Sequence, residues 1–164
     1  MNIWEFISIF GDVQFWTGAA LTSLLFLLAV PKKARKNITW FVFLVLPAVI
    51  ISYSITYGLK YFLKIPRPCL GLATCPTSYS FPSGHATVIF AAMTALSLHY
   101  RNKKLTVFLM LFGLLVSVSR VMLGVHEPLD VIFGSIIGIV SGFLVYRAYE
   151  NYQKEIKGIV SEIK

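Results

Sequence analysis

Three short polar clusters interrupt a strongly apolar chain, and their side chains suit the chemistry of phosphate. In chain order the clusters are Lys60 with Arg67-Pro68, then Pro82-Ser83-Gly84-His85, then Ser119-Arg120 with His126 and Asp130. Three cations can neutralise a phosphoryl dianion, and a glycine turn can offer backbone N–H groups. Two histidines and a carboxylate can supply a nucleophile, a proton donor and an orienting group. We therefore expect the clusters to meet in one pocket.

The first cluster is predicted at the end of a helix. Lys60 should lie in the last turn, because the residue before Pro66 is disfavoured in helical geometry. Arg67 lies between Pro66 and Pro68, which restrict its backbone and reduce the entropy cost of placing its guanidinium against an anion. Taken alone, these cations could also be ordinary basic residues at a membrane interface, which is the role that we predict for Lys64.

The second cluster is typical of a helix start. Ser83 is a suitable N-cap and Gly84 allows a ligand to approach the backbone. The unpaired N–H groups and the positive end of the helix dipole favour an anion there, with His85 close enough to carry a proton. A helix cap beside an interfacial histidine is the alternative.

The third cluster combines a cation, a histidine and a carboxylate. Arg120 is a poor lipid-facing residue and must find an anion or extend to the interface. Pro128 fits the first turn of a further helix, and Asp130 in that turn can reach back to His126. Such a carboxylate would fix the imidazole tautomer. A capped helix with a chance histidine is the alternative.

The elements that must position these clusters are membrane helices. Hydrophobic residues make up 57% of the 164 residues and the mean hydropathy is +0.74, above the range of soluble domains. Segments close to the roughly 20 residues that a bilayer requires are Phe15 to Val30, Ile38 to Leu63, Gly84 to Tyr100, Leu105 to Val121 and Leu129 to Tyr149. The sequence predicts one all-α domain over residues 1–164, a polytopic bundle of about five transmembrane helices with the motifs within residues 60–130.

The net charge of +8 follows the gaps between these segments. Because the basic residues form no single stripe with interleaved aromatic residues, we predict no nucleic-acid partner. By the positive-inside rule, eleven of them are cytoplasmic: Lys32, Lys33, Arg35, Lys36, Arg101, Lys103, Lys104, Arg147, Lys154, Lys157 and Lys164. The other four are Lys60, Lys64, Arg67 and Arg120. We therefore expect a multi-pass cell-membrane protein with its pocket on the extracytoplasmic face and its C-terminus in the cytoplasm.

The N-terminal residues 1–12 are too short to span a bilayer. They combine apolar and acidic side chains, namely Trp4, Phe6, Ile7 and Phe10 with Glu5 and Asp12. An interfacial helix is the prediction.

Two cysteines, Cys69 and Cys75, fall in the loop that we place outside the membrane. An oxidising compartment would permit a disulfide there. Two unpaired thiols are the alternative, because two cysteines alone specify little.

Gly134, Gly138 and Gly142 give the last helix a small-residue face. Close packing inside the bundle is the favoured interpretation. A homodimer through this face is the second.

Taken together, the three clusters closely resemble the three signatures of the type 2 phosphatidic acid phosphatase superfamily, also called lipid phosphate phosphatases. The resemblance covers Lys60 to Asp130 and is complete at the positions quoted. Membrane members of that family typically have six spanning helices, whereas this sequence indicates five and a short N-terminal segment.

The resemblance implies a phosphatase with a phosphohistidine intermediate. His126 would attack phosphorus, Asp130 would orient it, and His85 would protonate the leaving oxygen and later help to activate water. Lys60, Arg67 and Arg120, with Ser83 and the Gly84 amide, would hold the other phosphate oxygens. The sequence has no carboxylate cluster to hold a divalent ion, so we predict metal independence and no cofactor.

The substrate implied is a lipid phosphate or diphosphate at the membrane surface. Phosphatidylglycerophosphate, phosphatidic acid and a polyprenyl diphosphate remain open, and the compact chain favours the last. A non-catalytic phosphate-lipid binding or transport protein is the main alternative, although a binder needs no pair of proton-transferring histidines. A vanadate haloperoxidase is also raised by the resemblance, but those relatives are soluble.

Overall fold

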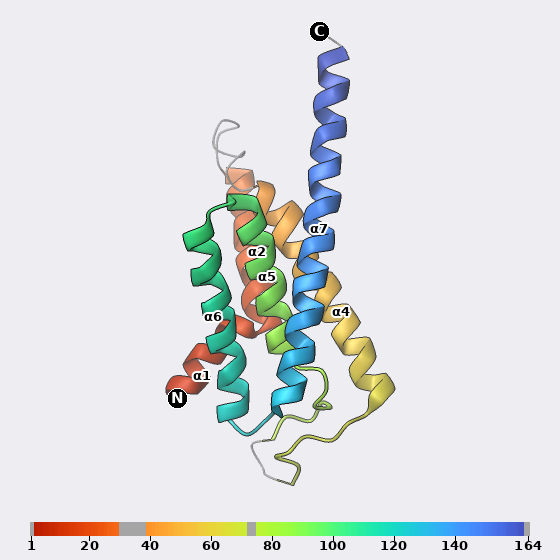
Figure 1. Ribbon diagram of the computed structural model, residues 1–164. Coiled ribbons are helices and arrows are strands. Elements are labelled where there is room, and N and C mark those ends of the chain that lie inside the picture. Colours follow the sequence, from red (N-terminus) through yellow and green to blue (C-terminus); the bar gives the residue numbers. More distant parts are fainter. Residues whose placement is uncertain (1, 30–38, 72–74, 163–164) are drawn as a thin grey trace.

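The computed structural model describes residues 2–29, 39–71 and 75–162, and every regular element in these ranges is helical (Figure 1). The elements are α1 (Ile3–Ser8), η1 (Ile9–Gly11), α2 (Val13–Ala29), η2 (Phe41–Val45), α4 (Leu46–Leu63), α5 (Gly84–Tyr100), α6 (Lys103–Met122) and α7 (Pro128–Glu162). The π-helical turn η2 runs into α4 without a break. The predicted all-α fold is confirmed for the described residues.

Long helices occupy the described parts of all five segments predicted from the apolar runs; Val30 and Ile38, which end two of these segments, lie outside the described residues. Three of them are long and apolar enough to cross a membrane, namely Phe41–Leu63, Lys103–Met122 and the Pro128–Ile159 part of α7. Helices α2 and α5 have 17 residues each and are shorter than these spans. The count of five transmembrane helices therefore stays a prediction.

Helix α5 lies at the centre of the bundle, packed against α4, α6 and α7. Eleven of its 17 residues are buried, as expected for a helix that is apolar on all sides. Its first turn, which carries Gly84 and His85, consequently lies in the middle of one end of the bundle (Figure 1).

The glycine face of α7 packs against α5. A Cβ at Gly134 would lie 2.5 Å from the Ser83 carbonyl oxygen, and one at Gly142 would lie 2.6 Å from that of Ala91; Gly138 faces the Thr87 carbonyl in the same way. Side chains at these positions would force the two backbones apart. This face is therefore buried within the monomer, as the favoured interpretation expects, and the homodimer stays a prediction.

The helix ends that bear the polar clusters converge at one end of the bundle. Helix α4 ends at Leu63, and the left-handed backbone of its C-cap residue Lys64 (φ 53°) turns the chain away. Lys60 therefore lies in the last helical turn, as predicted. Ser83 is the N-cap residue of α5, but its side chain makes no capping hydrogen bond, which corrects one detail of the prediction. Pro128 is the first residue of α7, as predicted.

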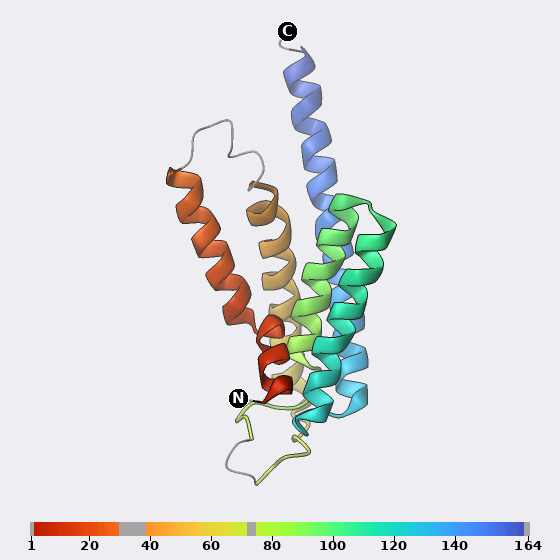
Figure 2. The same cartoon turned by 90° about the vertical axis from the view of Figure 1, so that its left-hand side faces the viewer.

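The N-terminal segment lies at this same end, beside α6 (Figures 1 and 2). Ile3 and Phe6 of α1 are exposed, whereas Ile7 and Phe10 pack against the core. The segment thus has one face packed on the bundle and one apolar face exposed. Its placement at a membrane interface stays a prediction.

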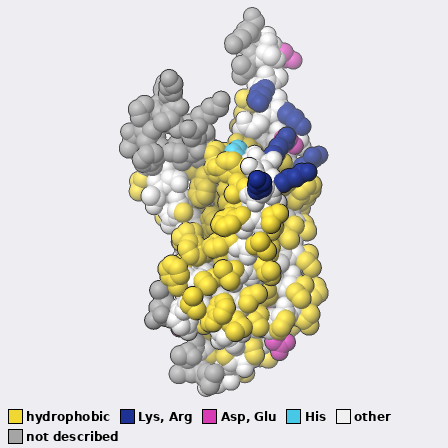
Figure 3. All heavy atoms as spheres, turned by 60° about the vertical axis from the view of Figure 1, so that its left-hand side comes forward, with side chains coloured by type: hydrophobic (Ala, Val, Ile, Leu, Met, Phe, Trp, Pro, Cys, Tyr) yellow, Lys and Arg dark blue, Asp and Glu magenta, His cyan; other side chains and the backbone are white. Residues whose placement is uncertain are grey.

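The surface shows a broad band of hydrophobic side chains, with Lys and Arg gathered at the end from which α7 projects (Figure 3). The basic residues at this end include Arg101, Lys103 and Arg147. At about 1.5 Å per residue, the 35-residue α7 is longer than the roughly 30 Å core of a bilayer. Its C-terminal part consequently extends past the other helices (Figure 1).

Candidate active site

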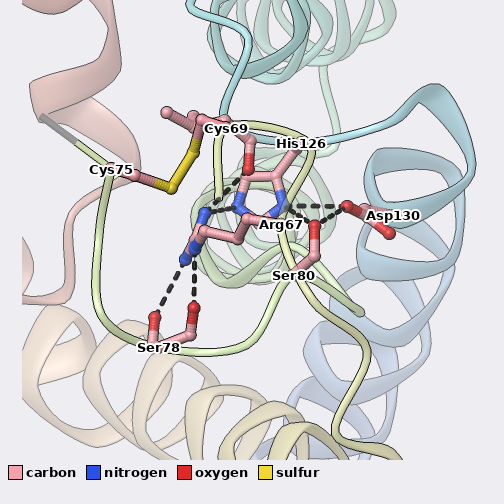
Figure 4. The surroundings of a disulfide bond; sticks show 8 residues. Arg67, Cys69, Cys75, Ser78, Ser80, His126 and Asp130 are labelled. Carbon is pink, nitrogen blue, oxygen red and sulfur yellow. Dashed lines mark hydrogen bonds and ion pairs between the residues drawn. A yellow bond between two sulfur atoms is a disulfide. The ribbon is translucent and has the colours of Figure 1, made fainter. Parts of the chain in front are cut away.

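His126 lies in the connection between α6 and α7, and its ring is held from both sides (Figure 4). Its Nδ1 is 3.0 Å from Oδ2 of Asp130. A carboxylate can only accept here, so the ring proton belongs on Nδ1 and Nε2 keeps a free electron pair. Asp130 Oδ2 also accepts a hydrogen bond from the Glu127 backbone N–H at 3.0 Å. The carboxylate is thereby fixed one helical turn beyond the histidine that it orients.

The environment keeps His126 neutral. Burial lowers the pKa of His126 from 6.5 to about 4; the hydrogen bond to Asp130 opposes this shift, and the positive charges of Arg67 and Lys60 add to it. A neutral imidazole with a free Nε2 is the form that can act as a nucleophile.

Arg67 connects the loop between α4 and α5 to this histidine. Its Nη1 donates to the Val125 carbonyl oxygen at 2.8 Å and lies 3.1 Å from His126 Nε2. On the other side, Nε donates to the Ser78 carbonyl at 2.7 Å and Nη2 to the Ser78 hydroxyl at 2.9 Å (Figure 4). Its Nε and Nη2 donors therefore hold the loop at Ser78, and its Nη1 lies at hydrogen-bond distance from the Nε2 electron pair.

Lys60 approaches the same space from the last turn of α4. Its ammonium group donates to the carbonyl oxygens of Tyr79 and Ser80 at 2.6 and 2.8 Å. An ammonium has three donors, so one remains for a ligand.

Arg120, near the end of α6, has buried donor capacity without a protein acceptor. Its side chain is 9% exposed, and its Nε is buried without a hydrogen-bond partner among the described residues. The Ser83 hydroxyl is likewise buried and unpartnered. A buried polar group without a partner costs free energy, so Arg120 is suited to a ligand that supplies oxygen atoms.

A cavity of about 210 Å³ joins these groups. Six of the eight predicted site residues line it: Lys60, Arg67, Gly84, His85, Arg120 and His126. The other two lie behind this wall, where Asp130 contacts His126 and Ser83 donates its backbone N–H to the Asp130 carbonyl at 2.9 Å. The two histidines, 41 positions apart in the sequence, thus line a single cavity at one end of the bundle.

Ser80 is a site residue that sequence reasoning missed. It is 1% exposed, and its hydroxyl donates a short hydrogen bond to Asp130 Oδ2 and lies 3.4 Å from His126 Nδ1 (Figure 4). No spacing rule links it to Asp130, which is 50 positions away. Ser78, which holds Arg67, was missed for the same reason.

The N-terminal segment also contributes to the cavity, which the sequence did not indicate. Gly11, Asp12 and Val13 line it together with residues of the three clusters.

The loop that carries Arg67 is closed by a disulfide between Cys69 and Cys75 (Figure 4). Of the two alternatives that the sequence left open, the structure has the bridge. Arg67 and Ser78 join the two limbs of this loop just outside the cysteines, so the disulfide and the arginine constrain the same segment.

A metal site of the usual kind is not formed by the described residues, in which no three His, Cys, Asp or Glu side chains are grouped to hold an ion. The cavity instead brings together cationic side chains and a helix start.

Comparison with known proteins agrees with this arrangement. The sequence model of the PAP2 superfamily matches residues 41–154. The chain is 34% identical over 120 residues to undecaprenyl-diphosphatase BcrC of Bacillus subtilis, an alignment that covers 70% of this chain and 59% of that protein. It is 34% identical over 142 residues to an undecaprenyl-diphosphatase of Sulfolobus acidocaldarius, covering 85% of this chain and 66% of the relative. The chain thus spans about three fifths to two thirds of the length of these curated relatives.

Solved structures show the same architecture. The crystal structure of Aquifex aeolicus LpxE has a TM-score of 0.68 and 26% identity, and the match covers 88% of this chain and 83% of that one. A PAP2-type phosphatidylglycerolphosphate phosphatase from Bacillus subtilis has a TM-score of 0.69 at 22% identity, covering 99% and 77%, and supports the fold alone. Because the superfamily match extends over more than half of the sequence and includes all three clusters, the chain belongs to the PAP2 superfamily.

Proposed function

We propose that this protein is an integral-membrane phosphatase that hydrolyses a lipid phosphomonoester or diphosphate through a phosphohistidine at His126. The observation that carries the proposal is the arrangement of His126, with Nδ1 held by Asp130 at 3.0 Å and the ring lining a cavity that Lys60, Arg67 and Arg120 also line.

The reaction needs two proton transfers and no redox partner. Nε2 of His126 forms a P–N bond while the P–O bond to the leaving group breaks. His85, which the negative charge of the bound phosphate would help to protonate, gives its proton to the departing oxygen. A water molecule then attacks phosphorus and passes a proton to His85, the P–N bond breaks, and its electron pair returns to Nε2. Asp130 stabilises the positive ring of the phosphohistidine through Nδ1–H.

The cations would hold the phosphate oxygens during both steps. Phosphoryl transfer depends mainly on positioning and on stabilising charge. Arg120 has a buried donor without a protein acceptor, and Lys60 retains one N–H. The Gly84 amide at the start of α5 adds a neutral donor at the cavity wall. The Ser83 hydroxyl is buried behind that wall and would have to turn toward the cavity to add a second. In this account no metal ion takes part.

A groove between α2 and α4 favours a substrate with an apolar tail. It has a volume of about 260 Å³, and its lining side chains, among them Leu21, Leu24, Val42 and Ile50, are almost all apolar. Tyr53, one turn along α4 from Ile50, already lines the phosphate cavity. A lipid could thus place its head group in the cavity and its tail along α2 and α4.

Among lipid substrates we favour a polyprenyl diphosphate over phosphatidylglycerophosphate and phosphatidic acid. Two relatives named undecaprenyl-diphosphatase, each 34% identical to this chain, support this choice.

We further propose that the cavity opens on the extracytoplasmic face. The basic residues at the end from which α7 projects support a cytoplasmic C-terminus by the positive-inside rule. The Cys69–Cys75 disulfide at the opposite end suits an oxidising compartment.

Phosphate release from a panel of these lipids in detergent tests the proposal. His126→Ala should abolish release, and His85→Ala should slow substrates with poor leaving groups more than those with good ones. His99→Ala is the matched control, because His99 stacks on Trp40 with ring centres 4.4 Å apart and does not line the cavity. Full activity of His126→Ala would refute the nucleophile assignment, and binding of every lipid without release would favour the non-catalytic alternative.

A further inference from the structure

The proposed proton donor lacks the kind of support that the proposed nucleophile has. His126 is held by Asp130 and Arg67, whereas the His85 ring makes no hydrogen bond among the described residues. Packing must therefore set the position of His85.

One packing partner of His85 comes from the N-terminal segment. A Cβ placed on Gly11 would lie 2.9 Å from the His85 Cβ, 3.1 Å from the His85 carbonyl oxygen and 2.9 Å from Cγ1 of Val116. Carbon atoms of real side chains do not approach other atoms this closely. The Cβ and the carbonyl oxygen of His85 are at or next to the backbone of α5, so they cannot turn aside as the end of a flexible side chain could. Gly11 is thus the residue that lets η1 lie directly on the first turn of α5.

The segment that carries Gly11 is itself held in place. The Trp16 indole N–H donates to the Phe10 carbonyl oxygen at 2.8 Å, and the Phe10 ring packs edge-on against Phe112 at 5.3 Å. Trp16 is 8% exposed, so this hydrogen bond is shielded from water. η1 therefore presents a fixed backbone surface to His85.

From these contacts we infer that Gly11 is a positioning residue for the proton donor, so that the N-terminal segment is part of the active site. The inference rests on the proposed phosphatase function. It adds a residue outside positions 41–154, where the superfamily sequence model matches. The role of Gly11 is steric: it fixes the distance between His85 and the leaving oxygen by allowing η1 and α5 to touch.

Gly11→Ala is the direct test. The added methyl must push η1 and the first turn of α5 apart, which changes the position of His85 relative to the cavity. We expect kcat to fall about tenfold for a substrate with an alkyl leaving group. For p-nitrophenyl phosphate, whose leaving group needs little protonation, the rate of nitrophenolate release in the first turnover, before water enters, should change less than twofold. KM should stay within about twofold for both substrates. Gly18→Ala is the matched control, since a Cβ there meets nothing within 4 Å, and it should change neither rate.

A double-mutant cycle separates a positioning role from a general loss of structure. In a His85→Ala background, Gly11→Ala should have no further effect on the alkyl substrate, because the group that it displaces is gone. The inference would be overturned if the rate losses of the two single variants multiplied in the double variant. It would also be overturned if Gly11→Ala lowered the rates for the alkyl and the aryl substrate equally.

Trp16→Phe provides a second variant if Gly11→Ala does not fold. It keeps an aromatic ring and removes the hydrogen bond to Phe10, so it should reproduce the leaving-group-dependent loss in weaker form, about threefold. An unchanged ratio of alkyl to aryl rates would contradict the inference. Failure of the phosphatase proposal is distinguishable from these outcomes, because the unaltered protein would then release no phosphate from any substrate.

Discussion

Asp130 receives hydrogen bonds from three directions, from the His126 ring, the Ser80 hydroxyl and the Glu127 backbone. Each hydrogen bond restricts the orientation of the carboxylate, and the carboxylate in turn restricts the orientation of the imidazole ring. The reactivity proposed for His126 therefore depends on groups that do not face the cavity.

Ser80→Ala should slow the reaction by loosening this carboxylate. A hydrogen bond to a charged group contributes about 1.5–3 kcal/mol, so we expect kcat to fall about tenfold or more. KM should stay nearly constant, because Ser80 does not line the cavity. Ser135→Ala is the control, since its hydroxyl donates within α7 to the Val131 carbonyl. A loss confined to KM would argue against the orienting role.

The low pKa of His126 also predicts how stability depends on pH. Between pH 6.5 and about 4 the unfolded chain protonates His126 while the folded protein does not, so the folded state loses stability as pH falls through this range. The full shift corresponds to about 3 kcal/mol. The free energy of unfolding of the detergent-solubilised protein, measured as a function of pH, should show this decrease in the unaltered protein and not in His126→Gln. The same pH dependence in both proteins would contradict the buried, neutral histidine.

At the scale of elements, the loop between α4 and α5 is constrained twice, by the Cys69–Cys75 disulfide and by the hydrogen bonds of Arg67 to Ser78. By reducing the conformational entropy of the unfolded chain, closure of so short a loop stabilises the folded state by about 2 kcal/mol. The disulfide should therefore help to hold Arg67 beside the cavity.

Reduction of the disulfide should consequently raise KM more than it lowers kcat. Arg67 would lose part of its fixed geometry toward phosphate. The His126–Asp130 pair would keep the direct bond between the two side chains and the bond from the Glu127 backbone, which lie outside this loop. The comparison is between initial rates with and without a reductant, and Cys69→Ser/Cys75→Ser should match the reduced protein and respond to no reductant. Identical KM values in all these states would show that the loop needs no bridge.

The helices could be predicted because long apolar runs and residues such as Pro66 and Pro128 mark them in the sequence. The three clusters could be predicted to meet because each lies at a helix end on the same side of the bundle. Ser80 and Gly11 could not, since their contacts with Asp130 and His85 depend on how distant segments pack. The cysteine pairing was left open because sequence does not give the distance between the two side chains.

For the whole molecule, the two ends of the bundle differ in chemistry. The α4–α5 loop, which carries the disulfide, and the start of α5, which lines the cavity, lie at one end (Figure 1). The basic residues around α7 lie at the other (Figure 3). A hydrophobic band separates them, as expected for a protein that crosses a bilayer.

The proposed orientation predicts which end is accessible from outside the cell. Glu127→Cys, at the cavity end, should react with a membrane-impermeant maleimide in intact cells, whereas Lys157→Cys should react only after permeabilisation. Both positions are exposed, and the native cysteines are bridged. The reverse pattern would invert the topology, and labelling of both from outside would contradict a membrane between the two ends.

Trapping the covalent intermediate tests the central claim most directly. Purified protein would be mixed with a ³²P-labelled lipid phosphate, quenched in alkali within the first turnover and mapped by peptide analysis. We predict an acid-labile, alkali-stable label on the peptide that contains His126, and none in His126→Gln. Turnover without any labelled peptide, or label on a residue other than His126, would contradict the account.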